Sequence, residues 1–283
     1  MTAATSSIRW VVPRWKDPRV TLSVALTAYT VLGQTVLYFN RDVRQLAAAV
    51  LAACITDMVL AFALRRILLV PISAYITGLS VGILLESYDL RVFLLASFWG
   101  ITSKHLLRTR GGHFFNPSNF AIVAALFLGH GLASVAPGSQ WGGKLWIAVV
   151  ILVLGFMLMR RVNRLDLVGA WVIGFIVMGL GRMALGQGGL VFALGPMLGG
   201  EFALFSFSMI PDPKASPRTR RARILWGAGL AVADGVLRFF EVRYSMFYTL
   251  FVFCAALPII EWMRGSGEAE PEPWKTVERS VRG

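Results

Sequence analysis

Long apolar stretches separated by short polar connections run along most of the 283-residue chain. A stretch of about 18 or more apolar residues can cross a bilayer as a helix, so this recurrence predicts an all-α polytopic membrane protein. We expect ten transmembrane segments, at residues 20–39, 45–64, 67–86, 91–103, 118–136, 145–160, 165–181, 187–210, 224–241 and 245–262. The fourth is short for a span, and glycines near Gly78 and from Gly186 to Gly189 predict broken or half-length helices.

The charges lie mainly in the connections. The net charge is +13, but basic residues confined to short loops offer no continuous face for phosphates, which argues against nucleic acid as a partner. With the N-terminus in the cytoplasm, 21 of the 28 Lys and Arg residues fall in cytoplasmic loops. This positive-inside bias predicts a cytoplasmic N-terminal segment (1–19), a transmembrane domain (20–262) and a polar, disordered cytoplasmic tail (263–283).

Four carboxylates lie within or at the ends of the predicted segments: Asp57, Glu86, Glu201 and Asp234. A charged side chain at membrane depth is costly, so it faces a partner or a cavity. Asp234 lies four residues before Arg238, a spacing that favours an ion pair on one helix face. Glu86 closes the third segment as an interfacial residue. Structural pairing and function both stay open for Asp57 and Glu201, and we assign Asp57, Glu201 and Asp234 to a predicted ion or proton path.

A basic stretch joins the fourth and fifth segments. It starts at Lys104 and His105, Gly112 lets the backbone approach a ligand closely, and Asn116–Pro117 forms a turn that opens the next helix. Basic side chains near a helix N-terminus suit a phosphate or another anion, so we predict that these residues bind a cofactor. The alternative is a loop that only obeys the positive-inside rule. The spacing of His105 and His113 matches no strong metal motif, and we expect no metal.

A second polar corner follows the eighth segment. Gly200 and Glu201 lie within the apolar eighth segment itself. Asp212 follows the segment, between two prolines of which Pro213 is the second, and five basic residues come after it. We add these four residues to the predicted cofactor-binding set. The last helix pair, 234–261, is dense in aromatic residues, which form either an interfacial belt or a surface for a flat redox cofactor or quinone.

Three stretches together resemble one family, the RnfD/NqrB membrane subunits of the ion-pumping Rnf and Na⁺-NQR complexes. They are KHLLRTRGGHFFNPSNFAIVAALFL (104–128), SFSMIPDPKASPRTRRARILWGAGL (206–230) and DGVLRFFEVRYSMFYTLFVFCAALPIIE (234–261). The resemblance covers roughly residues 65–262. It implies two inverted five-helix repeats with broken helices, and flavin-linked electron transport coupled to movement of Na⁺ or H⁺ in a bacterial inner membrane, with both termini cytoplasmic.

The chain departs from this family at the flavin. Members carry FMN on a threonine about ten residues before the aspartate of the Asp-Pro turn, and counting back from Asp212 reaches Phe202. Phenylalanine cannot form the phosphoester, so we expect no covalent FMN. The resemblance then implies a divergent redox subunit with noncovalent FMN or riboflavin, or a quinone, working with membrane lipid and other redox subunits.

Other functions remain open from the sequence. Relatives resembling this subunit accompany natural-product clusters such as those for enediynes, so an accessory role in such biosynthesis is one variant. The five-plus-five architecture is also similar to that of urea transporters, which makes a channel or transporter for a small polar solute or cation the main alternative. A structural scaffold for an assembly is the third.

Overall fold

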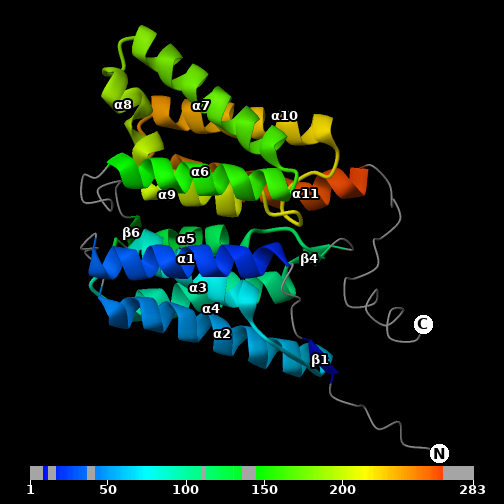
Figure 1. Cartoon of the computed structure of the whole chain (residues 1–283). Helices are drawn as coiled ribbons and strands as arrows, with labels where there is room; N and C mark the ends of the chain where they lie inside the picture. The colour runs from blue at the N-terminus through cyan, green and yellow to red at the C-terminus, as the bar shows by residue number, and fades with distance from the viewer. Residues whose placement is uncertain are drawn as a thin grey trace, which may run out of the picture.

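The computed structural model describes residues 9–11, 17–36, 42–109, 112–129, 131–135 and 145–263. The all-α prediction is confirmed, since helices make up most of the described chain and the strands are short (Figure 1). The helices of the N-terminal half are α1 (Pro18–Thr35), α2 (Val43–Arg65), α3 (Ile72–Leu84), α4 (Leu90–Leu106) and α5 (Pro117–Leu128). The C-terminal half holds α6 (Leu145–Arg161), α7 (Leu165–Ala184), α8 (Leu190–Leu194), η2 (Gly195–Leu198), α9 (Gly200–Leu204), η3 (Phe205–Met209), α10 (Arg220–Phe239) and α11 (Ser245–Met263).

The strands pair across helix connections. They are β1 (Arg9–Val11), β2 (Ile67–Leu69), β3 (Leu85–Glu86), β4 (Arg108–Thr109), β5 (Gly112–His113) and β6 (Ser134–Val135). β1 pairs in parallel with β2, whereas β3 with β6 and β4 with β5 are antiparallel. The predicted tail lies outside the described residues except for Met263, as does most of the predicted N-terminal segment.

Each predicted apolar segment overlaps a helix, but their lengths differ. By length and composition, α2 and α7 are the two described helices that can each cross a membrane alone, and the bent run from α8 to η3 makes a third if it counts as one span. α3 and α5 have 13 and 12 residues. At about 1.5 Å per residue they fall well short of a hydrocarbon core of about 30 Å. Ten transmembrane spans therefore stay a prediction.

Two boundaries of the predicted segments are wrong for identifiable reasons. The third segment begins with β2, because Ile67–Leu69 pairs with β1, and helix α3 starts only after Pro71. The fifth ends early, because α5 stops at Leu128 and the chain turns into β6. Gly78 does not break α3. A Cβ there would lie 2.5 Å from the Val50 Cα, so this glycine lets α2 and α3 pack closely.

The broken helix is real, but its break comes later than the glycine cluster suggested. Gly186–Gly189 belongs to the turn that precedes α8, whereas the bend of 58° separates Leu190–Leu198 from Gly200–Met209. Gly199 lies at that bend in an extended conformation. The run then ends in η3, a wide π-helical turn whose Ser206 hydroxyl accepts a hydrogen bond of 3.0 Å from the Trp171 indole N–H.

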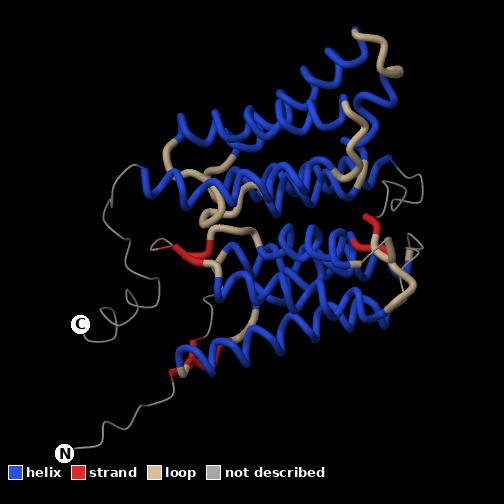
Figure 2. The backbone as a smooth tube through the Cα atoms, turned by 180° about the vertical axis from the view of Figure 1, so that it is seen from behind, coloured by secondary structure: helices blue, strands red, loops and turns tan. Residues whose placement is uncertain are grey.

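Two helix groups lie side by side, α1 to α5 in one and α6 to α11 in the other, as both views of the backbone show (Figure 1, Figure 2). They meet where α5 packs on α11: the Asn119 side chain donates to the Phe247 carbonyl at 3.1 Å, and the rings of Phe115 and Phe251 stack at 4.7 Å. The start of α1, the end of α11 and β4 lie at the same end of the bundle (Figure 1). We call this the basic end.

Candidate functional site

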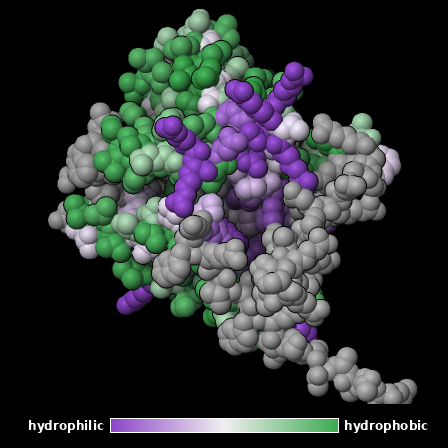
Figure 3. Space-filling model, turned by 45° about the vertical axis from the view of Figure 1, so that its right-hand side comes forward, coloured by the Kyte–Doolittle hydropathy of each residue, from purple (hydrophilic) through white to green (hydrophobic). Residues whose placement is uncertain are grey.

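The basic end gathers polar residues from separate parts of the chain. Hydrophilic side chains surround a hollow there, between apolar flanks (Figure 3). The β4–β5 hairpin, the loop 210–219 and the ends of α1, α2 and α4 contribute. Like charges lie close together here: Lys104 feels the charges of Arg19 and Arg65. Lys214 feels the charges of Arg108, Lys104 and Arg19. This basic cluster is an environment that favours an anion.

Asp212 lies at the junction of the two predicted corners. Its Oδ2 accepts a hydrogen bond of 3.2 Å from the Asn116 amide and lies 3.6 Å from Nε2 of His113, while its Oδ1 accepts the Lys214 backbone N–H at 3.0 Å. Asn116 also caps α5, because its Oδ1 accepts the Asn119 N–H at 3.0 Å. Burial by itself raises the pKa of the Asp212 carboxyl, but His113 and the Lys214 N–H outweigh it and hold the pKa below its ordinary value.

The loop that carries Asp212 is fastened to α7 and α10. Arg164, buried just before α7, donates to the Ser216 hydroxyl and to the Pro217 carbonyl, each at 3.1 Å. The Arg223 guanidinium of α10 donates hydrogen bonds to both carboxylate oxygens of Asp166 on α7. Sequence reasoning missed these residues, because Arg164 and Arg223 appeared only as loop charges. Pro213 and Gly112 lie in this region, and the Lys214 side chain passes over Gly112, which adopts φ +119°.

A second cluster, which we call the Asp57 cluster, lies between α2, α3 and α4. Lys104 Nζ donates to Asp57 Oδ1 at 2.7 Å and to the Ser73 hydroxyl at 2.8 Å, and His105 Nε2 lies 2.7 Å from the same Asp57 oxygen. Asp57 is completely buried. Sequence analysis assigned Lys104 and His105 to cofactor binding and Asp57 to an ion path. The structure brings all three together.

The other predicted residues lie elsewhere. Asp234 accepts hydrogen bonds from Arg238 at 2.7 Å and from Ser245 at 2.5 Å, which confirms the predicted pairing with Arg238. Glu201 is half-buried in the first turn of α9, where the charge of Arg238 acts on it. Among the described residues its carboxylate has no hydrogen bond or ion pair, and Gly200 beside it is buried. No described hydrogen bond or ion pair joins Glu201 to Asp212.

Phe202 lies in an aromatic core. It is 2% exposed, and its ring lies 5.9 Å from that of Trp171 and 4.9 Å from that of Phe175. The face of Phe175 also carries the Arg238 guanidinium at 5.1 Å. The aromatic residues of the last helix pair divide between two environments: Phe247 is buried, whereas Phe240 at the end of α10 is 70% exposed.

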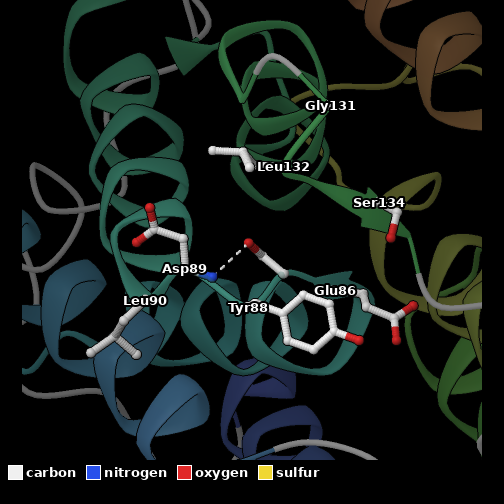
Figure 4. A pocket seen from close by; sticks show the side chains of 8 residues that line it. Glu86, Tyr88, Asp89, Leu90, Gly131, Leu132 and Ser134 are labelled. Atoms are coloured by element: carbon white, nitrogen blue, oxygen red, sulfur yellow. Dashed lines mark hydrogen bonds between the residues drawn. The ribbon is translucent and has the colours of Figure 1, made fainter.

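A shallow recess of about 590 Å³ lies beside the β3–β6 pair (Figure 4). Its wall includes Glu86, Tyr88 and Ser134, with Leu132 above. Its floor is organised locally, since the Asp89 backbone N–H donates to the Ser87 hydroxyl at 3.1 Å. Sequence reasoning named only Glu86 of this group. The described residues contain no group of three His, Cys, Asp or Glu side chains placed to hold a metal ion.

Comparisons with known proteins give no family. No family model matches the chain, and no curated protein matches it.

Proposed function

We propose that the chain is an integral membrane protein of RnfD-like kind that supports electron transport together with other membrane subunits. One observation carries the proposal: the three stretches that resemble that family meet in space. Asn116 in the first bonds Asp212 in the second, and Asn119 in the first bonds the Phe247 carbonyl in the third. The two pairs of bonded residues are 96 and 128 positions apart in the sequence. The fold, and not the continuity of the chain, therefore brings the stretches together.

The proposal includes ten membrane segments in two five-helix repeats. Its support is a repeated packing pattern, in which α2 packs on α4 as α7 packs on α10, and α4 packs on α5 as α10 packs on α11. α5 and α11 then meet at the centre. Half-length helices such as α3 and α5 are typical of membrane folds in which interrupted helices surround a central site. The proposed orientation puts the basic end in the cytoplasm of a bacterium, with both termini on that side.

The family's flavin does not fit at its usual position. The Phe202 ring fills that place against Trp171 and Phe175, and it offers no hydroxyl for a phosphoester. The anionic part of a noncovalent FMN fits the basic end instead, where Lys214 is exposed beside Gly112. There Lys214 and Arg108 would hold the phosphate, while Asn116 and Asp212 keep the corner rigid. When bound, the flavin would supply one- or two-electron transfer.

An absorption spectrum of the purified full-length protein tests this proposal. We expect flavin bands that pass into the supernatant on acid precipitation, together with an intact mass equal to that of the unmodified chain. Lys214→Ala should lower the flavin content, whereas Arg44→Ala, a matched loss of one exposed charge in the first turn of α2, should not. A colourless protein of unmodified mass would refute the flavin, and flavin retained in the pellet would refute noncovalent binding.

A channel or transporter for a small polar solute or cation is the second candidate. Glu201 favours it, because this carboxylate is unpaired among the described residues and follows a 58° bend in a membrane-type segment. Solute flux into liposomes without redox partners, abolished in Glu201→Gln, would favour transport over electron transfer.

A further inference from the structure

The Asp57 cluster has two polar atoms that its hydrogen bonds leave unused. Among the described residues, Nδ1 of His105 and Oδ2 of Asp57 are buried and have no hydrogen-bond partner. The His105 side chain is 2% exposed and that of Asp57 is 0% exposed. A buried polar atom without a hydrogen-bond partner destabilises the fold, so a structural role alone does not explain these two atoms.

The hydrogen bonds fix the tautomer of His105. A carboxylate can only accept, so the ring nitrogen 2.7 Å from Asp57 Oδ1 carries a hydrogen. In the neutral imidazole the second nitrogen, Nδ1, then has a lone pair and no hydrogen. Nδ1 is therefore the proton-accepting atom of the cluster, and the Asp57 carboxylate stabilises the imidazolium that forms when a proton arrives.

A metal cation suits this place poorly. The Lys104 ammonium already lies 2.7 Å from Asp57 Oδ1, and the positive charges of Arg65 and Arg19 reach the cluster from α2 and α1. The Cys54 thiol on α2 is a further titratable neighbour of Asp57 and Lys104. Hard cations such as Na⁺ prefer oxygen ligands, whereas the His105 atom without a partner is a ring nitrogen. Its lone pair therefore suits a proton better than Na⁺.

One side chain of the cluster reaches the surface, and two buried hydroxyls lie further along the same helices. The Lys104 side chain is 16% exposed at the basic end, which connects the buried carboxylate to the aqueous phase. Ser80 on α3 lies seven residues beyond Ser73, and Ser97 on α4 lies seven residues before Lys104, on the same helix faces. Both serines are completely buried, and their hydroxyls have no partner among the described residues. These hydroxyls lie about 10 Å deeper in the bundle.

We propose that His105, held by Asp57 and balanced by Lys104, is a proton-loading site at the basic end of the α2–α4 bundle. A proton from water adds to the Nδ1 lone pair, the Nε2–H bond to Asp57 persists, and the net charge of the three side chains changes from zero to +1. Release is the reverse step, in which the proton returns from Nδ1 to water. The site deepens the proposed function by naming H⁺ as its coupling ion, and only that coupling rests on the proposed function.

Nuclear magnetic resonance of the full-length, ¹⁵N-histidine-labelled protein in detergent tests the site. The chain has three histidines, and His105→Gln assigns the signal. We expect His105 to hold its hydrogen on Nε2 at high pH and to gain a second hydrogen on Nδ1 as the pH falls. Asp57→Asn should weaken proton binding by tenfold or more, and Lys104→Met should strengthen it severalfold.

Opposite signs for the two variants distinguish proton loading from general damage to the bundle. Asp166→Asn is the matched control, because it removes a paired, largely buried carboxylate of the other helix group and should leave the His105 titration unchanged. If Asp57→Asn does not fold, Lys104→Met alone decides. A hydrogen on Nδ1 at high pH, no titration, or equal titration in the wild type and the folded variants would overturn the proposal. Absence of flavin would leave this titration unaffected, so the two failures are distinguishable.

Discussion

The hydrogen bond between Asn116 and Asp212 joins the two predicted polar corners. Its contribution can be tested by measuring the free energy of unfolding of variants. Asn116 is 6% exposed and makes two hydrogen bonds, one that caps α5 and one to the Asp212 carboxylate. An N-cap contributes about 1 kcal/mol and a largely buried hydrogen bond to a charged group about 2 kcal/mol. Asn116→Ala should therefore lower the free energy of unfolding by about 3 kcal/mol.

Two further substitutions separate these contributions. Asn116→Ser keeps a capping oxygen but cannot reach Asp212, so it should cost about 2 kcal/mol. Asn116→Asp keeps the cap, removes the donor and brings two carboxylates together, so we expect it to be at least as harmful as Asn116→Ala. In Asp212→Asn, the cost of Asn116→Ser should shrink by about 1 kcal/mol or more.

Unfolding in mixed micelles with increasing dodecyl sulfate, followed by tryptophan fluorescence, measures these differences. Size-exclusion chromatography of each variant controls for aggregation. Equal stability of Asn116→Ser and the wild type, or equal costs of Asn116→Ser with and without Asp212→Asn, would refute an energetic link between the corners.

Three other outcomes follow from the structure. Gly78→Ala should destabilise by about 1–3 kcal/mol, because its Cβ would lie 2.5 Å from a backbone atom of α2, whereas Gly169→Ala, with open space around it, should be neutral or stabilising in thermal unfolding. The pKa of Asp212 is lowered by His113 from the ordinary 3.8, so its stabilisation should persist above pH 3.8 and be lost only below it; loss already at pH 6 in acid titration would contradict this. Glu201→Gln should keep the unfolding midpoint while abolishing ion-coupled activity, and unchanged activity would remove Glu201 from the site.

Hydrophobic patterning predicted the helices well, because burial in lipid or in a helix bundle demands the same apolar runs. It could not tell which apolar helices are long enough to cross a membrane alone. Helix α3 begins only after Pro71, and α5 ends where the chain turns after Leu128. Glycine was similarly ambiguous. Gly78 permits close helix packing while Gly199 marks a bend, and only the neighbouring backbone distinguishes the two roles.

The sequence predicted those contacts of the candidate sites that join residues close to one another along the chain. The Asp234–Arg238 pair follows from a four-residue spacing, and the Asn116 cap from the proline after it. The Asp57 cluster was not, because Lys104 lies 47 residues from Asp57 and 31 from Ser73. Such partners depend on how α2, α3 and α4 pack. No spacing or motif in the sequence predicts how these three helices pack.

The wide π-turn η3 has a consequence for the register of the chain. A turn of this kind holds one more residue than an α-helical turn, so everything after Met209 is rotated by about 100° relative to a regular continuation of α9. Deleting a single residue from 205–209 would restore the regular pitch and swing Asp212 away from Asn116. The extra residue therefore rotates the end of this helical run, and it sets the direction in which the loop that carries Asp212 leaves the run.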